Sequence, residues 1–490
     1  MSFAPNTISL PPLGERKRTI ALYVIAGITV IAVCIPGLWF AYAALALVGL
    51  SALLYVVAAT FRGRVDKLVA GWVLLFPLGY YYFSFPREHP IITLDRAFIG
   101  ILLVAACIVG ARGTIAIPVV IRRSAGFWGA FLFFALITIP RVKNPLNAGH
   151  LWVEAFFFPA LVAFFVLRNF NVRRNLAALH VATCIMAIYV AGVGAAEVVL
   201  QRDLMAVDET GILLAGDYGK QEAGDILVRP DGPFASTDTF ALVGLISFFF
   251  LLFLNRSLGQ MPTWQLWLHR AGMAAAIAIA LMPLFRSVLT SLAAVLLIDT
   301  YYSRGRARVT RIAVGGCLLL LLVLVRLALP AVFEERSDPM NVYGRIAQQG
   351  QTAMMFLDNP VNGVGLANFQ DAAQKSGKYM VYYQGVRSVD SAHNNLGQIL
   401  AETGLTGFVP YVIAQVLLFV AFFRIRKTNP PDTAIAWQMA LYIMLGYFIN
   451  GMSLTSGYAP ALNMWFMFSL AVIYKYAATR RDQPAPAAIT

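Results

Sequence analysis

Two residues, Arg286 and His393, have side chains and positions in the sequence that suit chemistry at a membrane surface. Arg286 interrupts the apolar run 271–300, where an arginine costs about 2.5–3.5 kcal/mol on membrane-insertion scales. It must therefore face water, a partner or an anionic ligand, unless its guanidinium only extends to the membrane interface. His393 lies beside two asparagines, where a long polar segment returns to an apolar run, and it could accept a proton there.

Two further arginines precede or begin polar stretches that contain glycine. Arg345 precedes a Gly-Val-Gly sequence at 363–365, and glycines there permit a tight turn with exposed backbone amides. Arg229 begins an Arg-Pro-Asp-Gly-Pro-Phe sequence at 229–234. A helix is expected to start just after it, near 236–238, where serine or aspartate could serve simply as a cap.

The composition indicates the class of molecule that must position these residues. Of 490 residues, 59% are hydrophobic and 13% are charged, whereas soluble domains carry about 25% charged residues. The mean hydropathy is +0.70, and many apolar runs approach the roughly 17–25 residues that span a bilayer as a helix. With 13% aromatic residues the chain is too apolar to be disordered. We therefore predict an all-α polytopic membrane protein.

The positively charged residues occur in short clusters between the apolar runs, as in membrane proteins whose basic loops face the cytoplasm. The net charge of +14 comes in short basic clusters between apolar runs, such as those near residues 16–18, 122–123, 173–174 and 304–311. A basic stripe with interleaved aromatic residues is not seen, which argues against nucleic-acid binding. Most acidic residues fall in the other breaks between runs. The positive-inside rule then places both termini in the cytoplasm.

The run 271–300 is expected to form a hairpin of two helices. A single helix would place the basic sequence at 303–308 outside and would reverse every later loop. Two short helices that turn near Pro283–Arg286 keep the alternation, and they place Arg286 at the outer membrane surface. This gives about 14 membrane helices, or about 12 if weak early runs are re-entrant or interfacial.

The expected organisation follows from these runs and breaks. It comprises a cytoplasmic segment 1–19, transmembrane helices over 20–200, a periplasmic loop 201–236, transmembrane helices with Arg286 over 237–330, a large periplasmic loop 331–403, C-terminal transmembrane helices over 404–476, and a cytoplasmic tail 477–490. Loops of this length in a compact protein are usually functional or disordered.

The motifs occur in a recognisable order. An Arg-x-x-Gly-x-Phe stretch at 229–234 precedes an apolar run, and the embedded Arg286 follows. A long outer loop then carries Arg…Asp-x-Pro…Gly-Val-Gly…Asn-Phe from Arg345 onward, and ends in His-Asn-x-x-Leu…Glu-x-Gly-x-x-Gly. This order resembles the O-antigen ligase and O-antigen/exopolysaccharide polymerase superfamily of bacterial membrane glycosyltransferases. The likeness is tightest over 225–425, under half of the chain.

One departure from the family pattern concerns the embedded arginine. Many members carry a Ser-Arg-Gly-like triplet at this place, whereas this chain reads Phe285-Arg286-Ser287. The charge is retained, and the difference lies in the residues on either side of it.

The resemblance implies a fold, a reaction and roles for matching residues. The fold would be of the membrane-exterior glycosyltransferase (GT-C-like) type, and the reaction a metal-independent, inverting glycosyl transfer. His393 would assist or position the acceptor hydroxyl as a catalytic residue. Arg286, also catalytic, would bind the pyrophosphate leaving group together with Arg345 and Arg229. No cofactor is implied, and the chain offers no Asp-x-Asp motif for a divalent cation.

The resemblance also implies partners and a location. The donor would be a glycan linked to undecaprenyl pyrophosphate, and the acceptor a glycan or lipid A–core. A chain-length regulator and a flippase are further partners of such enzymes. The protein would be a multi-pass protein of the bacterial inner membrane, with its active site facing the periplasm.

Weaker candidates are polar or aromatic residues in the outer segments. Arg141 and Lys143 could bind sugar or phosphate, or could only anchor the chain at the interface. Tyr382 and Tyr383 could stack on sugar rings, and Asn394 could contact the glycan; packing within the loop is the alternative.

The remaining histidines and the cysteines receive no functional assignment. His89, His180 and His269 have no supporting constellation in the sequence, and the four cysteines each lie inside an apolar run without metal-like spacing. We therefore expect no metal site.

The amino-acid sequence leaves three functions open. A polymerase that joins lipid-linked repeat units is preferred, and a ligase that moves the finished glycan onto lipid A–core uses the same residues. A transporter or lipid flippase is the rival from another class. Transporters place ionisable residues near the midplane of two related halves, whereas here the charges gather at the outer face.

Overall fold

A computed structural model describes residues 66–78, 84–85, 92–93, 96–102, 117–201, 204, 229–234, 236–303, 305–328, 330, 339–388, 391–428 and 434–481. The expected segment 1–19, the first apolar runs up to residue 60, most of the loop 201–236, His89 and the tail beyond 481 lie outside the described residues. The description below concerns the unit that begins at Val69.

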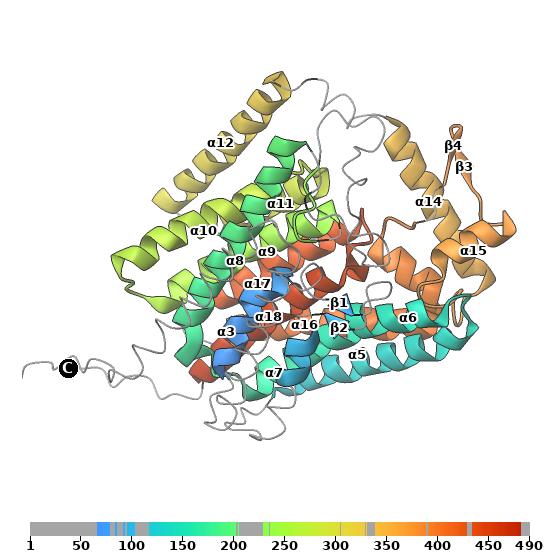
Figure 1. The fold of residues 1–490 in the computed structure, drawn as a ribbon, viewed down its shortest axis with the longest axis horizontal. Coiled ribbons are helices and arrows are strands. Elements are labelled where there is room, and N and C mark those ends of the chain that lie inside the picture. The colour runs from blue at the N-terminus through green and yellow to red at the C-terminus, as the bar shows by residue number, and fades with distance from the viewer. Residues whose placement is uncertain are drawn as a thin grey trace, which may run out of the picture. The chain divides into compact units, whose positions relative to one another are not determined.

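The described elements are almost all helical (Figure 1). The α-helices are α3 (Asp66–Leu75), α5 (Val119–Thr138), α6 (Pro145–Leu151), α7 (Phe158–Asn169), α8 (Val172–Leu200), α9 (Thr237–Leu258), α10 (Thr263–Leu281), α11 (Arg286–Tyr302), α12 (Arg306–Ala328), α14 (Pro339–Asp358), α15 (Phe369–Ser376), α16 (Asn395–Thr428), α17 (Ala434–Gly451) and α18 (Pro460–Arg481).

Short elements complete the description. They are the turns η1 (Phe76–Leu78), η2 (Ile139–Arg141) and η5 (Ser456–Tyr458), the π-helical η3 (Trp152–Phe157), and two antiparallel pairs, β1 (Ser84–Phe85) with β2 (Ile92–Thr93) and β3 (Tyr382–Tyr383) with β4 (Val386–Arg387).

The helices confirm the predicted class of an all-α polytopic membrane protein. Five segments among the described residues are long and apolar enough to cross a membrane: Val119–Arg141, Pro145–Asn169, Val172–Leu200, Thr237–Leu258 and Asn395–Arg424. A total of 12–14 membrane helices stays a prediction, since the first runs lie outside the described residues.

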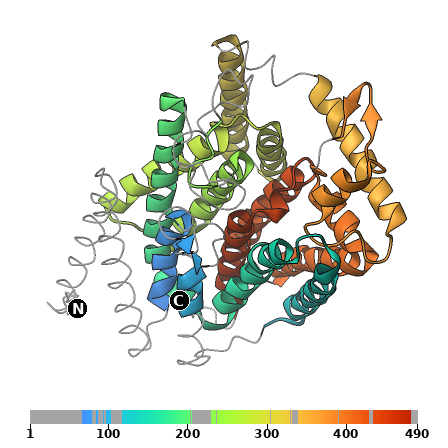
Figure 2. The ribbon, with the colours of Figure 1, turned by 45° about the vertical axis from the view of Figure 1, so that its right-hand side comes forward.

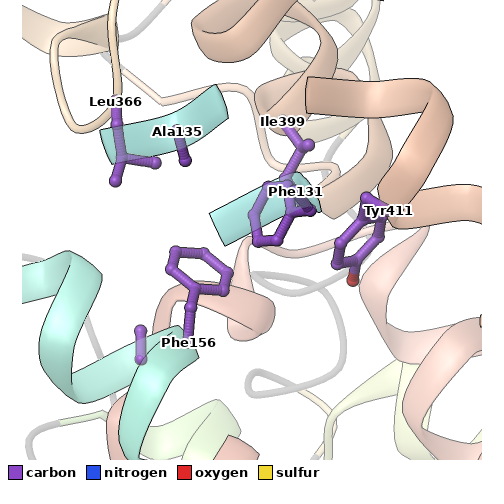
Figure 3. Close-up of a cluster of buried hydrophobic side chains, with 7 residues drawn as sticks. Phe131, Ala135, Phe156, Leu366, Ile399 and Tyr411 are labelled. Atoms are coloured by element: carbon purple, nitrogen blue, oxygen red, sulfur yellow. The ribbon is translucent and has the colours of Figure 1, made fainter. Parts of the chain in front are cut away.

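One hydrophobic core ties the central helices to the large loop. Phe131 of α5 packs edge-on against Phe156 and Tyr411, with ring centroids 5.2 Å apart in both pairs. Ile399 of α16 and Leu366 of the large loop complete this cluster (Figure 3). Because Leu366 is fully buried, the loop that carries it is fixed to the membrane helices.

The predicted hairpin over 271–300 is confirmed. Helix α10 ends at Leu281 and α11 begins at Arg286, which places the turn where the charge pattern requires it. Leu284 in the turn adopts a positive φ of 53°, a conformation that ordinary residues seldom adopt. The hairpin lies close to α9, because a Cβ on Gly244 would come within 2.7 Å of the backbone nitrogen of Ala280.

The large loop 331–403 holds more regular structure than a Gly-, Asp- and Asn-rich sequence suggests. It contains α14, α15 and the β3–β4 hairpin, which gather together in both views (Figures 1 and 2). The strands pair Tyr382 with Arg387 and Tyr383 with Val386. Helix α16 begins at Asn395, inside the segment expected to be loop, and is kinked at Gly404, where the apolar span was expected to start.

The kink at Gly404 explains the glycine motifs. Gly404 has φ 60° and ψ −165°, which frees carbonyl groups of the preceding turn from their intrahelical partners. The backbone N–H groups of Val364 and Gly365 donate to the carbonyls of Ala401 and Glu402, at 2.9 and 2.8 Å. The N–H of Leu405 donates to Pro360 at 2.9 Å. The Gly-Val-Gly segment is therefore locked onto α16.

The buried side chain of Glu402 holds the same segment. Its carboxylate accepts hydrogen bonds from the backbone N–H groups of Ala367 and Phe369, at 2.9 and 3.4 Å. It also accepts from Gln398 at 3.1 Å and from the Tyr458 hydroxyl at 2.8 Å. A buried carboxyl group needs such partners, so Glu402 joins α16, the loop and the last helix pair.

Replacing Gly404 by alanine is expected to destabilise the protein by about 2–4 kcal/mol. An alanine Cβ would lie 2.2 Å from the Val361 carbonyl oxygen, and the backbone angles suit only glycine. The measurement is the unfolding temperature in detergent. Gly316→Ala on α12 is the matched control, since its Cβ would meet nothing within 4 Å. Equal unfolding temperatures for the two variants would contradict the account of the kink.

Candidate active site

Arg286 is the first residue of α11, and its side chain is exposed at the hairpin turn. The helix N-cap, Phe285, offers no side-chain hydrogen bond to the first N–H groups of the helix. Uncapped N–H groups and the helix dipole favour an anion at this place. The next residue fixes the turn, since the Ser287 hydroxyl donates to the Asn450 side-chain oxygen.

Arg345 lies on α14, close to Arg286. Its Nη1 donates to the backbone carbonyl of Ser453, between α17 and α18. Partial burial lowers the pKa of Arg345, and the positive charge of Arg286 lowers it further. Neither arginine forms an ion pair with a carboxylate among the residues that the structure describes. Two neighbouring guanidinium groups with no carboxylate partner in the described part of the chain suit a strong anion.

His393 is close enough to Arg345 to be affected by its charge, and it lies two residues before the start of α16. Burial lowers the pKa of His393, and the charge of Arg345 lowers it further, so the imidazole is neutral near pH 7. Its Nδ1 is buried and has no hydrogen-bond partner within the described part of the chain. The residue adopts a positive φ of 44°. A neutral imidazole with an unsatisfied nitrogen is suited to accept a proton.

The connection 450–459, taken to include the last two residues of α17 as well as the loop to α18, holds these elements together. Asn450 accepts from Ser287, and Ser453 accepts from Arg345. The Gly457 N–H donates to the Asn395 side chain at 2.8 Å, at the start of α16. A Cβ on Gly451 or Gly457 would lie 2.5 or 2.8 Å from the Asn395 side-chain nitrogen, so a larger residue at either position would displace that side chain.

The role of this connection was not predicted from sequence. Residues 450–459 read only as a short polar break between two apolar runs. Their partners are separated from them by between about 55 and 165 positions, and nothing local in the chain indicates such pairing. The density of asparagine and glycine in this break was the one available signal.

Arg229 lies at the same end of the helix group as Arg286. The segment 229–234 is bound to the end of α8, where the Gly232 N–H donates to the Glu197 carboxylate at 2.8 Å. A Cβ on Gly232 would touch Phe240 near the start of α9, and α9 in turn packs on the end of α10. The structure thus supports a shared membrane face for the two arginines, while the pyrophosphate-binding role of Arg229 stays a prediction.

The weaker candidates fall into two groups. Lys143 forms an ion pair with Asp371 of α15, Nζ to Oδ1 at 2.7 Å, and Arg141 is exposed beside it. Tyr382 and Tyr383 lie on the β3–β4 hairpin and are exposed.

Two further weaker candidates, Tyr383 and Asn394, also have partners within the protein. The ring of Tyr383 packs against Tyr343 of α14, with centroids 5.8 Å apart. The Asn394 side chain accepts from the Gly397 N–H at 3.0 Å, and so caps α16.

One expectation from the sequence is corrected. His180 and His269 were expected to lack a supporting constellation, and the structure places them together with Cys184 in a buried cluster. The residues come from α8 and α10, and because His180 and His269 are 89 positions apart, nothing in the sequence indicated that they are neighbours.

The comparison with known families agrees with this geometry. Residues 271–412 match the family model described as O-antigen ligase. The match contains Arg286, Arg345, His393 and Glu402. It confirms the resemblance to the O-antigen ligase and polymerase superfamily, and it supports a glycosyltransferase of the ligase or polymerase type. No curated protein matches the chain.

Proposed function

We propose that the protein transfers a glycan from undecaprenyl pyrophosphate and acts as a polysaccharide polymerase that joins lipid-linked repeat units. The observation that carries the proposal is the convergence of three residues from separate elements. Arg286 begins α11, Arg345 lies on α14 and His393 precedes α16, and the connection 450–459 contacts all three elements.

The two arginines suit a pyrophosphate leaving group. Negative charge develops on the bridging oxygen as the anomeric C–O bond breaks, and guanidinium groups match phosphate oxygens in bidentate geometry. Because Arg345 is bonded to the Ser453 carbonyl and Arg286 stands at the fixed start of α11, the two charges are present where the leaving group forms. The N-terminus of α11 adds oriented N–H groups at the same point. Such a site can perform an inverting transfer without a metal ion.

His393 provides the base for the same reaction. The acceptor hydroxyl loses its proton as its oxygen attacks the anomeric carbon, and the neutral imidazole can take that proton. The depressed pKa of His393 keeps the imidazole neutral at ordinary pH. Among the described residues Nδ1 has no hydrogen-bond partner, which leaves it as an acceptor position.

The distribution of charge supports a periplasmic active site. The basic residues at 122–123, 173–174, 256 and 304–311 flank the opposite ends of the helices whose other ends carry the site. The positive-inside rule then places the site on the periplasmic face of the bacterial inner membrane, with both termini in the cytoplasm.

A ligase that transfers the glycan to lipid A–core is the second candidate, because the matched family model is described as O-antigen ligase. The two reactions share donor chemistry and differ in acceptor. We would compare lipid-linked intermediates and finished polysaccharide from cells with and without the gene. Single repeats without long chains support the polymerase, and long chains on the carrier with bare lipid A–core support the ligase. Unchanged pools would contradict both and favour a transporter.

The pH profile tests the interaction between Arg345 and His393. Because the active form is the neutral imidazole, activity is expected to fall as pH drops through the depressed pKa of His393, below 6.5. In Arg345→Gln one cause of the depression is removed, and the acidic limb should shift to higher pH. The measurement is kcat/KM against pH.

The quantity that decides this experiment is the pH at which kcat/KM falls on the acidic side, and not the maximum rate. Lys378→Gln is the matched control, since Lys378 belongs to the same loop but pairs with Asp358 at 2.6 Å. An unshifted limb in Arg345→Gln would exclude His393 as the group that titrates.

A further inference from the structure

A second group of reactive side chains lies buried between α8 and α10, apart from the residues of the proposed active site. His180 Nε2 and His269 Nδ1 are 3.1 Å apart, and Cys184 Sγ is 3.8 Å from the same His180 nitrogen. One potential metal-binding atom from each residue lies within 4.8 Å of the others. His180 and Cys184 are fully buried, and His269 is 7% exposed.

The fold brings these atoms together through two local features. His180 and Cys184 are four positions apart on α8, so their side chains project from the same face of the helix. Gly272 on α10 allows the helices to approach closely, because a Cβ there would lie 2.9 Å from the Cys184 Sγ. His269 is one turn before Gly272 and therefore faces the same place.

The distances match those of a metal site. A tetrahedral ion with ordinary Zn–N and Zn–S bonds holds two nitrogens about 3.3 Å apart and a nitrogen and a sulfur about 3.6 Å apart. The cluster has 3.1 and 3.8 Å for the corresponding pairs. The ligand atoms of the third pair, Cys184 and His269, lie within 4.8 Å of each other.

A neighbouring amide is placed to orient one of the histidines. The Gln265 side-chain nitrogen Nε2 lies 3.1 Å from His180 Nδ1, the ring nitrogen that faces away from the cluster. Metal-bound histidines usually direct their second nitrogen at such a partner, which fixes the ring and the tautomer. A flip of the Gln265 amide would place its oxygen at Nδ1, and His180 would then present an unprotonated Nε2 to the ion.

We propose that His180, Cys184 and His269 bind one thiophilic transition-metal ion, Zn²⁺ or Cu⁺, that clamps α8 to α10. Both ions take imidazole and thiolate ligands. On binding, the Cys184 thiol gives its proton to solvent and the thiolate bonds to the metal. A Cu⁺ ion bound to one thiolate carries no net charge, whereas a Zn²⁺ ion leaves one positive charge in a buried site, which favours Cu⁺. The ligand separations close to those of a tetrahedral site favour Zn²⁺.

The bound metal ion would stabilise the packing of α8 on α10 and would take no part in glycan transfer. His180 and His269 lie in the first three turns of α8 and the first two turns of α10, and α10 carries the Arg286 turn at its other end. The proposal does not rest on the proposed function, and it revises the expectation from sequence that no metal is bound.

The test uses the full-length protein in detergent, purified without a metal-affinity step. Elemental analysis, before and after separate titrations with Zn²⁺ and with Cu⁺, is expected to find about one ion per chain in wild type and less than about 0.1 in Cys184→Ser and His269→Gln. The identity of the retained metal distinguishes the two ions. Cys317→Ser on α12, which removes an exposed free thiol, should bind as wild type does.

Two further measurements keep the test decisive if the variants do not accumulate. Co²⁺ bound to the wild-type protein should show a thiolate charge-transfer band, and metal should raise the unfolding temperature of wild type. Wild type that holds no stoichiometric metal after both titrations would overturn the proposal. Folded Cys184→Ser and His269→Gln that hold as much metal as wild type would do the same.

Discussion

His393→Ala is expected to reduce the rate of glycan transfer by about 10²–10⁴-fold, the usual contribution of a positioned general base. The reason is local: the imidazole is held neutral by burial and by Arg345, and its Nδ1 has no partner among the described residues. The measurement is the initial rate with a lipid-pyrophosphate-linked glycan and the purified protein in nanodiscs.

The control for this variant separates a proton acceptor from a structural residue. Added imidazole should restore part of the activity of His393→Ala, because a free base can enter the space that the side chain leaves. The variant should reach the membrane in wild-type amounts, since the Asn394 cap of α16 remains intact. Wild-type rates, or a loss that imidazole leaves unchanged, would contradict the role of His393 as base.

Arg286→Ala is expected to lower kcat by about 10²–10³-fold, the usual cost of removing one donor from a preorganised anion site. The guanidinium stands at the uncapped start of α11 beside Arg345, where leaving-group charge develops under the proposal. Arg286→Lys should recover only part of the activity, since a point charge lacks the bidentate geometry. Single-turnover rates measure both effects.

Arg326→Ala is the matched control for charge in an apolar segment. Arg326 also interrupts an apolar run and is also exposed, but it lies near the end of α12 rather than at a helix start beside Arg345. This variant should transfer glycan at the wild-type rate. If Arg286→Ala behaved as Arg326→Ala does, Arg286 would be an arginine that merely reaches the interface, and the anion site would be wrong.

The sequence predicted the parts of the site that local patterns encode. Arg286 in an apolar run is a costly placement, and the alternation of charged breaks required a turn near it; the structure has that turn between Leu281 and Arg286. His393 and Arg345 were found because they lie in a polar segment between membrane helices. Hydropathy also predicted the helical membrane class, because bilayer thickness dictates the length of each run.

The relations between distant segments could not be predicted in the same way. The bond from Tyr458 to Glu402 and the bond from Gly457 to Asn395 join residues of different helices, and a single sequence carries no signal for them. The helix α14 was read as loop because it lies in a Gly-, Asp- and Asn-rich segment and has no continuous apolar run that could span a membrane. Its stability comes from packing on α16 and the β3–β4 hairpin rather than from its own composition.

The connection 450–459 has a consequence for biosynthesis. It follows Arg286, Arg345 and His393 in the chain, so a ribosome releases all three before it makes the partners that fix them. A nascent chain that has inserted every earlier helix still lacks the carbonyl of Ser453 and the amide of Gly457. Under the proposed function, the site is therefore complete only once α17 and α18 are made, and partly synthesised copies would not consume the donor glycan.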